Sequence, residues 1–377
     1  MKTIFLIRGL EIGGAERQLI ALAIGLKKRG HDIMIIVFYG GGVMEAELRA
    51  AGIRVEELGK AGRWEIVRTF GRLLKLVRHE RPDILHGYLT VSNLLVGFMR
   101  PFLPGSRVVW GIRSGSTNFS DYDWTRAATD RLQRWLARSP HLIICNSDEG
   151  QRHHASIGYP ARRLQTIHNG IDTSLYRPDA RMATDLRRQW GVEPGDNVVG
   201  IVARLEPLKG HSTLFHAAAF VMAKRHNLKI VCVGAGAPGY EAELRQLAAR
   251  LGIAADVVWA GRNLQAGGVY NGFDIYCSSS AHGEGFPNVI AEAMASGVPC
   301  LVTDVGDSAK IVGNLGAVVA PRNADALAAG MLSLFDRLDH EGGALKQSVR
   351  QRVVESYGLE RLVQQTEECL QSILCRR

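Results

Sequence analysis

Short runs of apolar residues alternate with amphipathic stretches along nearly all of the 377 residues. Each run has the length of a buried strand, and each stretch repeats its apolar positions with the helical period. Because the runs are almost continuously apolar, we expect parallel sheets covered on both faces. The predicted strands are residues 3–7, 31–38, 53–58, 83–86, 107–112, 142–146 and 164–167, then 198–202, 229–233, 256–260, 275–278, 300–303 and 317–319.

This alternation predicts an α/β protein with two Rossmann-like, doubly wound domains. Residues 173–196 are more polar and contain two prolines and one predicted helix, 182–190, so we interpret them as a linker. Ligands of such sheets bind beyond the carboxyl ends of the strands. With two facing domains, we expect the site in an interdomain cleft. The predicted boundaries are 1–172, 173–196, 197–355 and a final segment 356–377.

Composition narrows the class of protein. An apolar fraction of 46% with 22% charged residues is typical of a soluble globular protein, and no apolar run is long enough to span a membrane. The six cysteines stand singly, which favours reduced thiols in a cytosolic protein over zinc or disulfide sites. The net charge of +9 suits nucleic acid, an anionic membrane or phosphorylated ligands, although a merely basic enzyme is equally compatible. No nucleic-acid recognition motif is present.

The segment 281–300 carries the most chemistry. Glu284 lies in a glycine-flanked turn, Pro287 is placed to begin a helix over 287–296, and Glu292 lies within that helix. A helix N-terminus attracts phosphate, and carboxylates accept hydrogen bonds from hydroxyls, so the segment suits a ligand with phosphates, a ribose and a sugar. The alternative is an ordinary strand–turn–helix with two solvated glutamates.

Two further patterns follow predicted strands. Gly13 and Gly14 open a helix and allow close approach of a ligand, but they do not form the G-x-G-x-x-G pattern of nicotinamide or flavin sites. Arg204 and Lys209 follow strand 198–202, where a guanidinium and an ammonium together suit a diphosphate. Each pattern has a simpler alternative, a tight turn for the glycines and solvated surface cations for the second pair.

His86 ends strand 83–86, where it faces the expected cleft and could bind a sugar or a reacting hydroxyl, unless it is a core histidine. The predicted helix 64–80 is apolar on one face and basic on the other. Such a helix either covers the sheet with its charges in water or lies against an anionic membrane.

Taken together, these motifs resemble glycosyltransferase family 4, whose members are retaining, nucleotide-sugar-dependent enzymes of the GT-B fold. The resemblance covers nearly the whole chain. Its most specific part is the E-x7-E motif from Glu284 to Glu292. Residues 13–16 match the family's N-terminal glycine loop, Arg204 and Lys209 match its cationic pair, and 169–172 match its N-G-[IV]-D motif.

The resemblance implies a role for each matched residue. Arg204 and Lys209 would hold the donor diphosphate, Glu292 the ribose, and Glu284 the transferred sugar. His86 would lie near the reacting centre, but the family's second histidine of H-x-H is replaced by Tyr88. The remaining donor-binding residues would be Gly13, Gly14, Gly285, Phe286, Pro287, Asn288 and Val289.

The same resemblance implies a retaining hexosyl transfer without a metal and without any cofactor beyond the UDP- or GDP-linked donor. The acceptor would be a glycan or a lipid-linked saccharide, in the biosynthesis of cell-surface polysaccharide, lipopolysaccharide or glycolipid. The final helix would cross back to the N-terminal domain. We expect a cytoplasmic protein, with contact to the inner membrane face through helix 64–80. A nucleotide-sugar epimerase and a non-catalytic nucleotide-sugar binder remain the alternatives.

Overall fold

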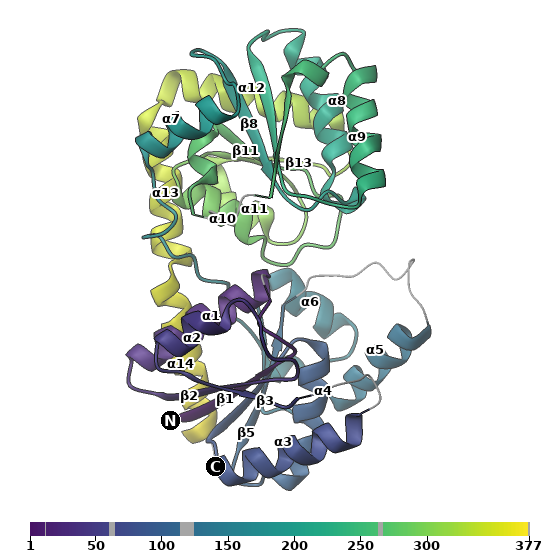
Figure 1. The fold of residues 1–377 in the computed structure, drawn as a ribbon, viewed down its shortest axis with the longest axis vertical. Helices are drawn as coiled ribbons and strands as arrows, with labels where there is room; N and C mark the ends of the chain where they lie inside the picture. Colours follow the sequence, from purple (N-terminus) through teal and green to yellow (C-terminus); the bar gives the residue numbers. More distant parts are fainter. Residues whose placement is uncertain (12, 60–64, 114–123, 263–266, 376–377) are drawn as a thin grey trace. The chain divides into compact units, whose positions relative to one another are not determined.

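The computed structural model describes residues 1–11, 13–59, 65–113, 124–262 and 267–375. The described chain forms two compact α/β units (Figure 1). Unit 1 comprises Met1–Gly170 together with Leu359–Arg377, and unit 2 comprises Ile171–Gly358. The first residue of the predicted helix 64–80 lies outside the described residues.

Unit 1 is built on a seven-stranded parallel sheet in the order β3-β2-β1-β4-β5-β6-β7. Successive residues of β2 enter opposite cores, since Ile33, Ile35 and Val37 pack on one face and Met34 and Ile36 on the other. This explains why the run is apolar at nearly every position. The strands are β1 (Lys2–Ile7), β2 (Asp32–Val37), β3 (Arg54–Glu57), β4 (Ile84–Tyr88), β5 (Arg107–Ile112), β6 (Leu142–Cys145) and β7 (Leu164–Thr166).

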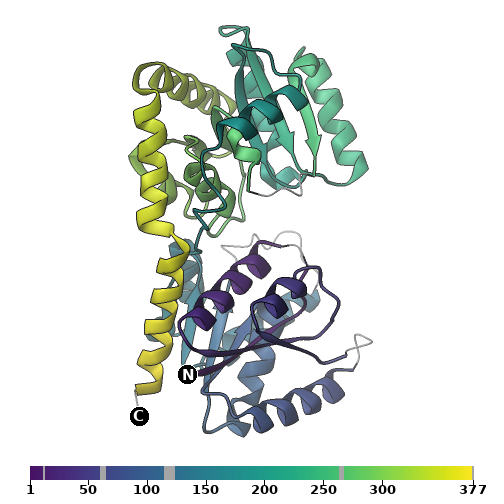
Figure 2. The ribbon, with the colours of Figure 1, turned by 60° about the vertical axis from the view of Figure 1, so that its left-hand side comes forward.

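Helices cover both faces of this sheet (Figures 1 and 2). Apolar residues of α1, α2 and α14 fill one core, and those of α3, α4 and α5 fill the other. The helices of unit 1 are α1 (Gly14–Lys28), α2 (Glu45–Ala50), α3 (Ile66–Glu80), α4 (Thr90–Met99), α5 (Trp124–Leu136), α6 (Asp148–Ser156) and α14 (Leu359–Cys375), with short 3-10 turns at Arg100–Phe102 and Ala161–Arg163.

Unit 2 has a six-stranded parallel sheet in the order β10-β9-β8-β11-β12-β13. Helices α8, α9 and α12 pack on one face, and α7, α10, α11 and α13 on the other. The strands are β8 (Asn197–Val202), β9 (Leu228–Val233), β10 (Val257–Gly261), β11 (Ile275–Ser278), β12 (Cys300–Thr303) and β13 (Ala317–Val319). The helices are α7 (Ala180–Gln189), α8 (His211–Met222), α9 (Pro238–Arg250), α10 (Asn288–Ala295), α11 (Ser308–Val312), α12 (Ala324–Glu341) and α13 (Gly343–Tyr357). The doubly wound α/β organisation predicted from the sequence is confirmed.

The segment 173–196, interpreted from its polarity as a linker, is an integral part of unit 2. Leu186 and Trp190 are buried in the same core as Phe273, and the rings of Trp190 and Phe273 stack with centroids 5.5 Å apart. Arg187 also forms an ion pair with Asp274 at 2.7 Å. The segment looks polar because only a narrow face of α7 contacts the core.

The last helix, α14, packs against α1 within unit 1. Gly25 allows the close approach, because a Cβ atom there would lie 2.3 Å from a methyl group of Val363. At the end of α1, Arg29 forms ion pairs with both Glu360 and Glu367 at 2.6 Å. Such exposed pairs contribute little individually, so the apolar seam provides most of the attachment.

None of the described helices is long and apolar enough to cross a membrane. In α3, Leu73 and Val77 are fully buried against the sheet, whereas Arg68 is largely exposed. The helix is therefore amphipathic as predicted, and its apolar face covers the sheet. Contact of its basic face with a membrane remains a prediction.

Replacement of Gly25 by alanine should destabilise unit 1 by about 1–3 kcal/mol, because the added methyl group would overpack the seam against Val363. The matched control is Gly71→Ala in α3, where the new Cβ meets no atom within 4 Å. That change should stabilise the helix by about 0.5–1 kcal/mol. Chemical denaturation of both variants measures the difference, and equal gains in stability would show that the α1–α14 seam tolerates a side chain.

Candidate active site

Two connections at the carboxyl edge of the unit 2 sheet are joined by hydrogen bonds. The Ala281 amide donates to the Leu208 carbonyl at 2.8 Å, and the Ser279 hydroxyl donates to the Lys209 carbonyl at 3.0 Å. Gly210 has φ +71°, and a Cβ atom there would lie 1.9 Å from the Ser279 carbonyl oxygen. Only glycine permits this approach, so the β8–α8 connection is fixed against the segment that follows β11.

Lys209 and Glu284 meet across these two connections. The Lys209 ammonium donates to Glu284 Oε1 at 2.6 Å, and the side chains are only 21% and 14% exposed. The Ser280 hydroxyl donates to the same oxygen at 2.7 Å. Two residues predicted to bind the same ligand are thus in direct contact, and the alternative of a solvated Glu284 is wrong.

A third connection, between β12 and α11, contacts the turn that carries Glu284. The Asp307 amide donates to the Gly285 carbonyl at 2.9 Å. Gly306 has φ +62°, and a Cβ atom there would lie within 2.7 Å of the carbonyl oxygens of both Glu284 and Gly285. The turn between β12 and α11 therefore needs a glycine at this position, and it fixes the backbone that carries Glu284.

Glu292 lies inside α10 and is also largely buried, with 9% exposure. The Tyr270 hydroxyl donates to Glu292 Oε2 at 2.6 Å, and Tyr270 itself is 1% exposed. Burial, followed by the nearby Glu292 carboxylate, raises the pKa of Tyr270 well above its ordinary value. The phenol therefore stays protonated and donates a strong hydrogen bond to the carboxylate. No sequence pattern singles out Tyr270, which lies 22 residues before its partner.

The helix that carries Glu292 is one residue shorter at each end than predicted, since Pro287 precedes the first helical residue and Ser296 follows the last. Gly297 ends it in the left-handed conformation, with φ +79°. Phe286 is buried, and its ring lies 5.3 Å from that of Tyr357. The predicted donor-binding residues Gly285, Phe286, Pro287, Asn288 and Val289 thus form the turn and first helical residues between the two glutamates.

Arg204 lies on the same connection as Lys209 but in a different environment. Its side chain is 71% exposed and forms an ion pair with Glu206 at 2.5 Å. A solvated pair of this kind is weak and can be exchanged for another anion. Arg204 can therefore turn toward an anionic ligand at the carboxyl edge of the sheet, whereas Lys209 is held by Glu284.

The other predicted site residues belong to unit 1. Gly13 precedes the first residue of α1, and Gly14 begins it. Strand β4 continues to Tyr88, so His86 does not end the strand as expected and is fully buried. Its ring lies between those of Phe5 and Tyr88, at 5.1 and 5.6 Å, and neither ring nitrogen has a hydrogen-bond partner among the described residues.

Burial, followed by the positive charge of Arg113, lowers the pKa of His86 to about 3. The imidazole is therefore neutral over the physiological range. The structure places His86 in the core of unit 1, behind Tyr88.

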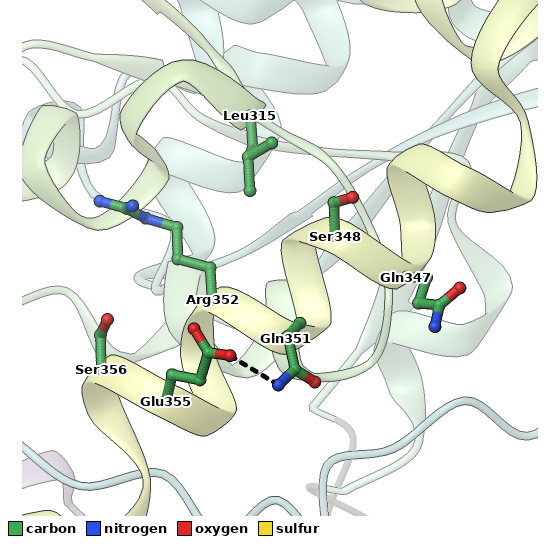
Figure 3. A pocket seen from close by; sticks show the side chains of 7 residues that line it. All are labelled: Leu315, Gln347, Ser348, Gln351, Arg352, Glu355 and Ser356. Atoms are coloured by element: carbon green, nitrogen blue, oxygen red, sulfur yellow. Dashed lines mark hydrogen bonds between the residues drawn. The ribbon is translucent and has the colours of Figure 1, made fainter.

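A hollow of about 420 Å³ lies elsewhere on unit 2, along α13 (Figure 3). Most of its lining residues are polar, and Gln351 donates a hydrogen bond to Glu355 (2.7 Å) one turn along the same helix. None of the predicted site residues contributes to this hollow. Its lining residues are Leu315, Gln347, Ser348, Gln351, Arg352, Glu355 and Ser356.

Two family models match this chain. The model described as "Glycosyltransferase Family 4" matches residues 12–175, and the one described as "Glycosyl transferases group 1" matches residues 196–337. The second match contains Lys209, Glu284 and Glu292. A D-inositol 3-phosphate glycosyltransferase from Rhodococcus erythropolis is 28% identical over 364 residues, which are 90% of this chain and 79% of the relative.

Solved structures show the same fold. The structure of Alr3699/HepE from Anabaena in complex with UDP superimposes with a TM-score of 0.86 at 24% identity, covering 99% of this chain and all of that one. WaaG, a glycosyltransferase involved in lipopolysaccharide biosynthesis, gives a TM-score of 0.71 at 15% identity, covering 98% of this chain and 99% of that one. The fold is therefore GT-B, and the chain belongs to the group 1 glycosyl transferases, glycosyltransferase family 4.

Proposed function

We propose that this glycosyltransferase uses a UDP-linked sugar and transfers it with retention of anomeric configuration to a hydroxyl of a glycan or lipid-linked acceptor. The observation that carries the proposal is the partly buried contact between Lys209 and Glu284, directly before the N-terminus of α10. An ammonium, a carboxylate and a helix N-terminus together match the diphosphate and the hydroxyls of a nucleotide sugar.

The donor would occupy the carboxyl edge of the unit 2 sheet. The diphosphate would take Lys209 from Glu284 and Arg204 from Glu206, while the carboxylate of Glu284 would accept hydrogen bonds from the sugar. Glu292, oriented by Tyr270, would hold the ribose. UDP is favoured over GDP because the Anabaena structures hold UDP and UDP-glucose, and that protein shares this fold.

In the proposed reaction, the acceptor oxygen forms a bond to the anomeric carbon on the side of the leaving group. The bond from that carbon to the β-phosphate oxygen breaks, and UDP leaves with its electron pair. The acceptor proton passes to the departing phosphate oxygen. Lys209, Arg204 and the positive end of α10 would stabilise the charge that develops on the diphosphate, so that no metal is required.

The names of similar proteins bear on the acceptor and on the cellular site. The similar proteins include a D-inositol 3-phosphate glycosyltransferase and a glycosyltransferase involved in lipopolysaccharide biosynthesis. We propose a role in cell-surface polysaccharide or glycolipid biosynthesis at the inner face of the membrane. The basic face of α3 would attract anionic lipid there.

The test of the proposed function is release of UDP or GDP from a panel of UDP- and GDP-sugars, with candidate acceptors present. Acceptor-dependent release supports transfer, and NMR of the product's anomeric proton establishes its configuration. Interconversion of the donor sugar without an acceptor would instead indicate an epimerase. Binding without turnover of any donor would indicate a non-catalytic binder.

Replacing either Lys209 with methionine or Glu284 with glutamine should lower kcat/KM for transfer by about 10²–10³-fold, because each change removes a group that acts on the diphosphate or on the sugar. The control is Lys229→Met. Lys229 pairs with Asp256 at 2.8 Å near the amino end of β9, so its loss should leave transfer unchanged. Equal rates for the wild type and for the Lys209 and Glu284 variants would show that neither residue belongs to the active site.

Replacing Tyr270 with phenylalanine should weaken UDP binding about tenfold or more, because a hydrogen bond to a charged group contributes about 1.5–3 kcal/mol. The effect should be much smaller for 2′,3′-dideoxy-UDP, whose ribose lacks the two hydroxyls that would donate hydrogen bonds to Glu292. Tyr276→Phe is the control, since this buried ring lies 5.8 Å from Tyr270. Isothermal titration calorimetry gives all the affinities, and equal losses for both nucleotides would contradict a positioning role.

A further inference from the structure

Arg113 is held at the carboxyl edge of the unit 1 sheet, directly after β5. Its guanidinium lies over the ring of Tyr88, with Cζ 4.2 Å from the ring centroid. One terminal nitrogen donates to Asn169 Oδ1 at 3.2 Å. The Nε atom is buried and has no hydrogen-bond partner among the described residues.

No carboxylate in the described part of the chain forms an ion pair with Arg113. Its partners there are a neutral amide and an aromatic ring, and the nearby His86 is neutral. Burial lowers the pKa of Arg113 from its ordinary value, and the groups that oppose this are Tyr88 and Cys145. Arg113 is only partly exposed and its Nε atom is buried. A guanidinium partly withdrawn from water without a counter-ion costs folding free energy, of which the contact with the ring recovers a part.

The surroundings of Arg113 are rigid. Gln18 and the backbone of Gly170 exchange two hydrogen bonds, at 2.8 and 2.9 Å, which fixes the segment that carries Asn169 against α1. Gly111 packs so tightly that a Cβ atom there would lie 3.1 Å from the ring of Tyr88. The charge is therefore held in place before any ligand binds, an arrangement typical of binding sites.

We propose that Arg113, with Asn169 and Tyr88, forms a subsite for an anionic oxygen group, a phosphate or a carboxylate, on the acceptor. The planar fork of a guanidinium matches both groups through paired hydrogen bonds. The subsite lies where the carboxyl ends of β4 and β5 meet, the edge at which sheets of this class bind ligands. The assignment of this anion to the acceptor rests on the function proposed above, whereas the existence of an anion site does not.

The test uses the full-length protein saturated with UDP, so that the donor phosphate site is filled. Glucose 1-phosphate, glucuronate and glucose are each titrated by calorimetry into the wild type and into Arg113→Met. We expect one or both anions to bind the wild type and glucose to bind neither protein. The Arg113 variant should lose at least tenfold in affinity for the anion. The anion that binds distinguishes a phosphate from a carboxylate acceptor.

The matched control is Arg107→Met, at the opposite end of the same strand, which should bind the anion like the wild type. Thermal unfolding without anion separates binding from folding. If Arg113 serves to bind a ligand, the unfolding midpoint of Arg113→Met lies at or above that of the wild type. If Arg113 serves to stabilise the fold, the midpoint of the variant is lower.

The proposal is overturned by equal anion binding in the wild type and Arg113→Met, by no anion binding in the wild type, or by a lowered unfolding midpoint in Arg113→Met alone. Failure of the proposed function has a different signature. In that case UDP does not bind the wild type, while anion binding still depends on Arg113.

Discussion

The candidate site of unit 2 depends on one partly buried ion pair, Lys209 with Glu284. A donor diphosphate needs a cation, and the hydroxyls of a sugar need a carboxylate, but a partly buried charge without a partner costs free energy. In this structure Lys209 and Glu284 are each other's counter-ion. Donor binding would replace this contact by two others, so that neither group is left buried and unpaired.

The scaffold makes this contact possible by bringing three connections together at the same edge of the sheet. Gly210 and Gly306 have positive φ angles, and any side chain at either position would collide with a backbone carbonyl of a neighbouring connection. Because these approaches involve backbone atoms, they leave little freedom to the turn that carries Glu284. The parallel sheet supplies the common edge, and the glycines allow the loops to meet there.

Much of the fold could be predicted from the sequence because strands buried on both faces must be apolar at nearly every position, as β2 is. Helix α6 could not be predicted from an apolar period, because its sequence is almost entirely polar. Its start is stabilised by a cap, in which the Gly150 amide donates to the Ser147 hydroxyl at 3.0 Å. The role of 173–196 was also missed, since the few apolar side chains of α7 carry its attachment to unit 2.

The site residues also differ in how far the sequence predicts them. Glu284, Glu292 and Lys209 belong to motifs that follow predicted strands and match the family, so a common site could be expected for them. Tyr270 and Arg113 could not be predicted in this way, because their partners are brought to them only by the folded chain. The burial of His86 depends on how far β4 continues, and strand ends are weakly encoded in sequence.

The most direct test of this account is the position of Lys209 in a crystal structure of the complex with a non-hydrolysable UDP-sugar. The account predicts that the ammonium lies within about 3 Å of a diphosphate oxygen. It also predicts that the distance from Lys209 Nζ to Glu284 Oε1, 2.6 Å in the present structure, then exceeds the range of an ion pair, about 4 Å. A bound donor with the pair intact, and with no phosphate oxygen near Lys209, would contradict it.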